Sequence, residues 1–390
     1  MRNENAEMRR TRKIFLAVAF VVIIAAVLAP CAAAYAPEIA LAPGFESQLE
    51  AVGADGLVQA LPPETRDALR ELGLDGIDLY SLLRASPRDI IHQFFNMLQG
   101  GLGSVVSSGV LALGVVLLTS FAFSIMPDDE KTRRALEVTG SMLALILLLP
   151  GLAELMRAAA AVVEAGANFS LMLIPILAGI LTASGRPAMA VSYHGLTFAA
   201  AQGLSQLASG VIIPVTGVVL GLSLVDGAAQ DARLSAVANA IKKAVIGTFA
   251  VLASLFTALL SIKSVITNTA DAMVIRGVRV VAGSIPLVGG AISEATGAIL
   301  SSVNLVKGAV GGFALIAALM LYAPVLIELL LWSVMLKLLS GAAELFGQSK
   351  AAGVFKSTAY AVAILSACVV FNAALLLIST GIVITMRGVV

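Results

Sequence analysis

The chain has 390 residues, of which 59% are hydrophobic and only 13% are charged, and its formal net charge is +1. A soluble globular chain is nearer half apolar and a quarter charged, so this composition indicates a membrane protein. The small net charge, with no basic stripe, argues against a nucleic-acid-binding protein, because phosphate binding requires clustered lysine and arginine.

The first 34 residues have the layout of a secretory signal peptide. A positive region precedes an apolar run over 14–28, and small residues follow at 32–34. This order is typical of a cleaved signal, and an uncleaved anchor helix is the alternative. Both readings place the next segment outside the cytoplasm. The positive region contains Arg9, Arg10, Arg12 and Lys13.

Residues 35–100 form a polar, acid-rich segment that we expect to be helical and extracytoplasmic. Pro63 with Glu64 suits the first turn of one helix, and Ser86 with Pro87 suits the start of another. The segment is too short for a large core of its own. We therefore expect it to lie on the membrane or to pack on the membrane domain.

Residues 101–390 are predicted to form a polytopic, all-α membrane domain, because their apolar runs match the roughly 20 residues that cross a bilayer as a helix. Pro175, Pro214 and Pro324 interrupt three of these runs, and each suggests a kink that is packed against protein, with a harmless kink as the alternative. About seven spans are predicted, at 102–125, 136–153, 168–184, 196–222, 244–262, 309–335 and 358–385.

The first loop, 126–134, carries Lys131, Arg133 and Arg134, which favours a cytoplasmic location. Seven spans then leave the 263–308 connection and the C-terminus on the cytoplasmic side. The charge bias conflicts with this arrangement at five positions that would lie outside. These are Arg233, Lys242, Lys243, Lys350 and Lys356.

The 263–308 segment is too polar for an ordinary span and too apolar for an ordinary loop. Its pattern predicts two amphipathic helices joined by a bend at Pro286, Gly289 and Gly290, lying in the interface or forming a re-entrant hairpin. A pore-lining or gating role makes these residues and Glu294 candidate functional residues. A helix pair that only anchors the chain is the alternative.

No catalytic, metal or cofactor motif is recognisable, and His92 and His194 lack metal-ligand spacing. Acidic residues inside apolar runs are therefore the remaining candidates, because an ionisable group at bilayer depth is expensive. Glu328 is the first of these, and a hydrogen-bonded neutral acid or a pair with Lys337 is the alternative. Glu154, with Arg157 three residues on, is interpreted as a solvated helix end. Glu164 is the third acidic residue of this kind.

Three segments of the second half resemble the stage III sporulation protein AE family. They are 261–265 (SIKSV), 269–271 (TAD) and 285–295 (IPLVGGAISEA). The order of signal, acidic segment and glycine-rich polytopic region is also similar to that family.

The resemblance implies a membrane channel or scaffold subunit of the complex that joins the mother cell to the engulfed forespore. It also implies the mother-cell membrane as location, and as partners other stage III sporulation membrane proteins and, through them, a forespore membrane protein. It brings no catalytic residue and no cofactor, and it leaves self-association open. A stand-alone secondary transporter is the alternative function, although no internal repeat is visible. An intramembrane protease would need paired catalytic acids or a Ser/His pair, which the sequence lacks.

Overall fold

The computed structural model describes residues 45–54, 56–84, 87–125, 130–228, 234–283 and 289–385, so the predicted signal at 1–34 lies outside the described residues. The described part is helical throughout and contains no strand, which confirms the all-α prediction. Its elements are α2 Phe45–Ala51, α3 Gly56–Gln59, α4 Pro63–Glu71, α5 Leu79–Arg84, α6 Pro87–Ile125, α7 Glu130–Ala183, α8 Pro187–Leu207, the π-helical η1 Ala208–Ile212, α9 Ile213–Ala228, α10 Leu234–Gly283, α11 Gly289–Leu345 and α12 Ser349–Thr385.

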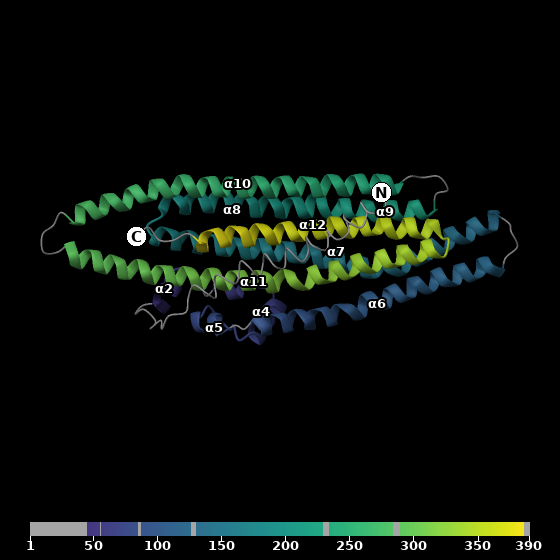
Figure 1. Cartoon of the computed structure of the whole chain (residues 1–390), viewed down its shortest axis with the longest axis horizontal. Coiled ribbons are helices and arrows are strands. Elements are labelled where there is room, and N and C mark those ends of the chain that lie inside the picture. Colours follow the sequence, from purple (N-terminus) through teal and green to yellow (C-terminus); the bar gives the residue numbers. More distant parts are fainter. Residues whose placement is uncertain are drawn as a thin grey trace, which may run out of the picture.

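The long helices lie side by side as one elongated bundle (Figure 1). Five of them, α6, α7, α10, α11 and α12, are long and apolar enough to cross a membrane. The sixth pass, formed by α8, η1 and α9 together, contains only the shorter apolar stretch Gly210–Val225. At 1.5 Å per residue, the 57 residues of α11 extend over roughly 85 Å, far more than a bilayer of about 30 Å requires.

The prediction of seven spans is wrong at α7. The expected spans 136–153 and 168–184 belong to one continuous helix of 54 residues, so no loop separates them. The residues between them include four consecutive alanines, 158–161. Alanine is the strongest helix former, and the helix therefore continues through the region where charge had indicated a loop.

Because α7 is one helix and not two, every later helix runs in the direction opposite to the predicted one. The passes alternate, so α7, α10 and α12 all begin at one end of the bundle (Figure 1). Seven predicted spans had put the lysines of α10 and α12 opposite those of α7. Here the basic residues of all three helix starts share one end, which the positive-inside rule favours as cytoplasmic. They are Lys131, Arg133, Arg134, Lys242, Lys243, Lys350 and Lys356.

The 263–308 segment also differs from the prediction. α10 continues without a break to Gly283, and α11 begins at Gly289, so the segment consists of the ends of two long helices. It lies at the end of the bundle opposite the first loop, not on the same side. Helical residues thus lie on both sides of 284–288, which is outside the described residues, but each stretch belongs to a long helix of the bundle. The interfacial or re-entrant placement stays a prediction.

The three predicted proline kinks are not covered by this chain. Pro175, Pro214 and Pro324 all lie within helical segments with their side chains exposed. A proline ring on the outer face removes a hydrogen bond only on that side and leaves the inward side of the helix intact. Packing of the described residues against each proline is therefore not found, and the alternative of a harmless proline is the one that fits.

The helices α2–α5 pack on the bundle, as one of the two predicted alternatives had it. Ser302 of α11 donates a hydrogen bond of 3.0 Å to the side chain of Gln48 in α2. Gly56 at the start of α3 lies against Met172 of α7. These contacts join the N-terminal segment to α7 and α11 at the end of the bundle where α12 ends (Figure 1).

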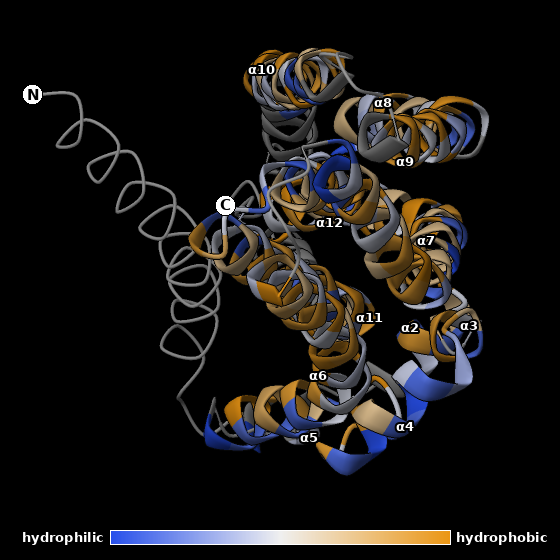
Figure 2. Cartoon of the chain, turned by 90° about the vertical axis from the view of Figure 1, so that its right-hand side faces the viewer, coloured by the Kyte–Doolittle hydropathy of each residue, from blue (hydrophilic) through white to orange (hydrophobic). Residues whose placement is uncertain are grey.

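Figure 2 shows the bundle end on, with α7, α11 and α12 at its centre, α8–α10 on one side and α6 with the N-terminal helices on the other. Large side chains of α11 fit against glycines of α7. Tyr322 lies against Gly166, and Trp332 lies against Gly151. Small residues permit this close approach of helices where no hydrophobic driving force exists between them.

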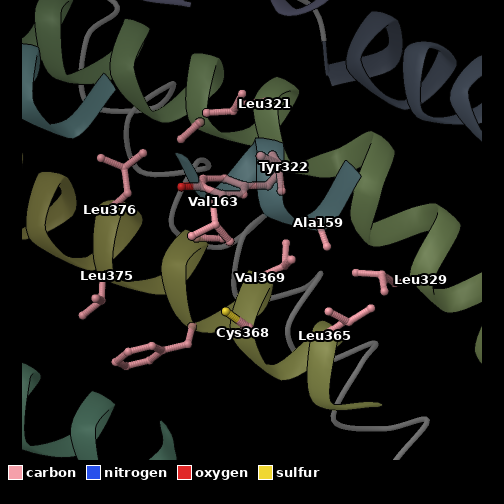
Figure 3. Close-up of a cluster of buried hydrophobic side chains, with 14 of the residues drawn as sticks. Ala159, Val163, Leu321, Tyr322, Leu329, Leu365, Cys368, Val369, Leu375 and Leu376 are labelled. Atoms are coloured by element: carbon pink, nitrogen blue, oxygen red, sulfur yellow. The ribbon is translucent and has the colours of Figure 1, made fainter. Parts of the chain in front are cut away.

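A cluster of buried side chains joins α7, α11 and α12 at the level of Tyr322 (Figure 3). Val163, Val369 and Cys368 belong to it, and Cys368 is a free, buried thiol. Nearby, the Asn372 side chain donates a hydrogen bond of 3.0 Å to the Val163 carbonyl. This bond ties α12 to α7 within the apolar part of the bundle.

Candidate functional site

The predicted site residues do not come together in space. Pro286 lies outside the described residues, and Gly289 and Gly290 form the beginning of α11. Glu294 follows in the second turn of the same helix, whereas Glu328 lies 34 residues further along. At 1.5 Å per residue these two glutamates are separated by about 50 Å along α11. The candidates therefore belong to two regions, the start of α11 and its middle.

Glu328 lies half-buried at the contact between α11 and α7. Glu154 of α7 acts on it electrostatically, and the contact between Gly151 and Trp332 brings the two carboxylates near each other. The buried Trp332, one turn along α11, interacts with the Glu328 carboxylate through its side chain. The alternative pairing with Lys337 does not occur among the described residues, because nine residues of helix put about 13 Å between the two positions.

The interpretation of Glu154 and Arg157 as a solvated helix end is wrong. Both lie near the middle of α7, and both are exposed on its outer side. Glu164 is exposed on the same helix, ten residues after Glu154. The charges that had suggested a loop therefore lie on the surface of one continuous helix.

A second group of charged residues ties α8 to α10 and α11. The carboxylate of Asp271, which is 1% exposed, accepts hydrogen bonds from the backbone N–H groups of Ala188 (3.1 Å) and Met189 (3.3 Å) at the start of α8. An acceptor at a helix N-terminus satisfies N–H groups that have no partner within the helix, and a negative charge there is favoured by the helix dipole. Asp271 is thus an N-terminal cap supplied by a different helix.

Two buried cations accompany this cap. Arg186, just before α8, is 6% exposed, and Lys307 of α11 is 5% exposed and interacts electrostatically with it. Burial lowers the pKa of Arg186 from its ordinary value, and the charge of Asp271 opposes that shift. Sequence reasoning missed this group, although one signal was present. Pro187 suits a first helical turn, yet neither Gly185 nor Arg186 before it is a capping residue, so the cap had to come from elsewhere.

A similar cap stabilises the opposite end of the bundle. The Glu137 side chain of α7 accepts hydrogen bonds from the Lys350 backbone N–H (2.8 Å) and the Ser349 hydroxyl (3.3 Å) at the start of α12. Beside it, the buried Gln348 side chain donates a hydrogen bond of 2.6 Å to the Val116 carbonyl of α6. Both ends of the bundle are therefore fastened by polar contacts between helices that are distant in sequence.

The matches to known proteins cover the same helices. The family model "Stage III sporulation protein AE" matches residues 81–387, which contain α6 to α12. The chain belongs to the stage III sporulation protein AE family. A curated relative, stage III sporulation protein AE of Bacillus subtilis (strain 168), is 23% identical over 232 residues, which are 58% of this chain and 57% of the relative. The aligned region thus spans little more than half of that relative. No solved structure matches the chain.

Family membership supports a role in sporulation, and the membrane-length helices of the family region indicate a membrane protein. The matched residues exclude the predicted signal and most of the acidic segment. The family region is therefore the bundle of α6 to α12 together with the end of α5.

Proposed function

We propose that this chain is a membrane channel or scaffold subunit of the complex that connects the mother cell with the forespore. In this role it lies in the mother-cell membrane and is needed for endospore development after engulfment. The observation that supports this most strongly is the family match over 81–387, because it covers every pass of the bundle. The five apolar helices of membrane length supply the physical basis for a membrane subunit.

The partners in this proposal are other stage III sporulation membrane proteins and, through them, a protein of the forespore membrane. The shape of the bundle supports a role in assembly, since α7, α10 and α11 are each at least 50 residues long and extend well beyond a bilayer. The parts outside the hydrocarbon are available to protein partners. We propose no catalytic activity for the chain.

Deleting the gene in the organism that encodes it tests the proposal. We expect forespores that complete engulfment and then arrest, and we expect a second copy of the gene to restore spore counts. The same cells are assayed during vegetative growth for uptake of amino acids, sugars and metal ions. Normal spore counts with defective solute uptake would contradict the proposal and favour the stand-alone transporter.

A further inference from the structure

The middle of α7 carries polar and charged residues on its outer face. Four exposed polar or charged residues, with the exposed Ala161 among them, recur at intervals of three or four residues: Glu154, Arg157, Glu164 and Asn168. Residues three or four apart share one face of a helix, so they form a continuous line, the α7 polar stripe. Hydrophilic colours mark part of the outer side of α7 in Figure 2.

The α7 polar stripe lies at the level where the rest of the bundle is most apolar. Gly166, within the stripe's length, contacts Tyr322 of α11, and the Val163 carbonyl binds Asn372 of α12. Both partner residues belong to the helical spans Ser301–Leu345 and Ser349–Thr385, which have the highest mean hydropathy of the candidate spans. The charges of α7 are therefore not at the end of a helix but beside the spans that best fit hydrocarbon.

α11 extends the α7 polar stripe by one more acidic residue. Glu328 is half-buried and interacts electrostatically with the exposed Glu154. The contact between Trp332 and Gly151 places them together, because Glu328 lies one helical turn from Trp332 and Glu154 one turn from Gly151. The two carboxylates therefore lie near each other where α11 meets the edge of the stripe.

Lipid is a poor environment for this surface. Placing one charged side chain at the centre of a spanning helix costs about 2.5–3.5 kcal/mol on insertion scales. The outer face of α10 shows what suits lipid, since Val251, Leu255, Leu259 and Ile262 are all exposed there. The N-terminal helices cover α7 only further along, where Gly56 meets Met172. No helix of the described residues covers the α7 polar stripe, whose side chains are exposed.

We propose that the α7 polar stripe and Glu328 form one wall of a water-filled passage, closed on its other side by a neighbouring subunit. This inference rests on the proposed channel function and names the surface that would serve it. The wall carries three glutamates, Glu154, Glu164 and Glu328, and one arginine, Arg157. A cleft with an excess of one sign of charge raises the local concentration of the opposite ion, so this passage favours cations.

Cysteine labelling in membrane fragments that are open on both sides tests the proposal in the assembled complex. The background chain has alanine in place of Cys31 and Cys368. Ala161→Cys reports the stripe, Ala159→Cys reports the buried side of the same helix, and Ala250→Cys reports the outer face of α10. Each variant is expressed in sporulating cells and treated with a cationic or an anionic methanethiosulfonate of similar size.

We expect the cationic reagent to modify Ala161→Cys at least tenfold faster than either control, because a thiol reacts as its thiolate and the thiolate requires water. The cationic reagent should also react severalfold faster than the anionic one, and Glu164→Gln should reduce that ratio. Only protein in the membrane fraction is assayed, and Asn168→Cys replaces Ala161→Cys if the latter does not insert.

Labelling of Ala161→Cys no faster than that of Ala250→Cys would overturn the passage, because lipid or tightly packed protein would then cover the stripe. Equal rates with the two reagents would overturn the preference for cations. Spore counts are recorded in the same strains. Arrested spores on gene deletion, combined with an unlabelled stripe, contradict the passage alone, whereas normal spores on deletion contradict the proposed function whatever the labelling.

Discussion

The contact between Gly166 and Tyr322 leads to a quantitative prediction about how α7 and α11 pack. A methyl group at position 166 would overlap the Tyr322 hydroxyl and come within 2.7 Å of its Cζ atom. Tyr322 is 2% exposed and enclosed by other side chains, so its ring has no free space to enter. We therefore expect Gly166→Ala to force the two helices or the ring apart.

Gly179→Ala is the matched control. Gly179 lies in the same helix, is exposed, and has no atom within 4 Å of an added methyl group. Both variants gain the higher helix propensity of alanine, worth roughly 1 kcal/mol, so this effect cancels in the comparison. Overpacking of a well-filled site costs about 1–3 kcal/mol. Gly166→Ala should therefore be about 1–3 kcal/mol less stable than Gly179→Ala.

The assay is unfolding of the purified chain in mixed micelles with increasing SDS, followed by circular dichroism. Gly166→Ala should unfold at a lower SDS fraction than Gly179→Ala. Adding Tyr322→Leu to Gly166→Ala should recover part of the loss, because the smaller side chain removes the overlap and the two changes are then not additive. Equal midpoints for Gly166→Ala and Gly179→Ala would refute this packing of α7 against α11.

Three further predictions concern the caps and the start of α11. Asp271→Ala should lower stability in the same SDS assay by about 1–2 kcal/mol, since it leaves helix N–H groups without an acceptor, and Asp271→Asn should lose less; equal losses would speak against capping. Glu137→Ala should lose about 1 kcal/mol by removing the cap of α12, and an unchanged midpoint would speak against that contact. Replacing Pro286 or Gly289 with leucine should sharply reduce spore counts while membrane fractionation shows normal insertion; full sporulation would reduce this segment to an anchor.

The membrane character of the chain could be predicted from its sequence because apolar runs of bilayer length are a local signal. α6, α10, α11 and α12 each contain one predicted span, at 102–125, 244–262, 309–335 and 358–385. The number of passes could not be predicted from the same signal. Charge within 154–167 indicated a loop, but the helix propensity of its alanines and the outward placement of its charges let α7 continue.

The contacts between helices could not be predicted, since they join residues distant in sequence. Gly166 has no feature that distinguishes it from Gly179 except the ring of Tyr322 in another helix. In the sequence, Asp271 is one of several charges in an amphipathic segment. Its role as a cap follows only from the position of the first N–H groups of α8 beside it. Glu328 was identified correctly as an unusual acidic residue, but its neighbour is Glu154 and not the expected Lys337.

The arrangement of the membrane passes is tested most directly at the two ends of α7. Ala135 and Ala183 are exposed near opposite ends of this helix, about 72 Å apart at 1.5 Å per residue. Ala135→Cys and Ala183→Cys are treated in intact protoplasts with a membrane-impermeant thiol reagent. With α7 as one pass, only Ala183→Cys should react from outside. If both positions react, or if both are protected until the membrane is opened, α7 does not cross the membrane once and the bundle described above is wrong.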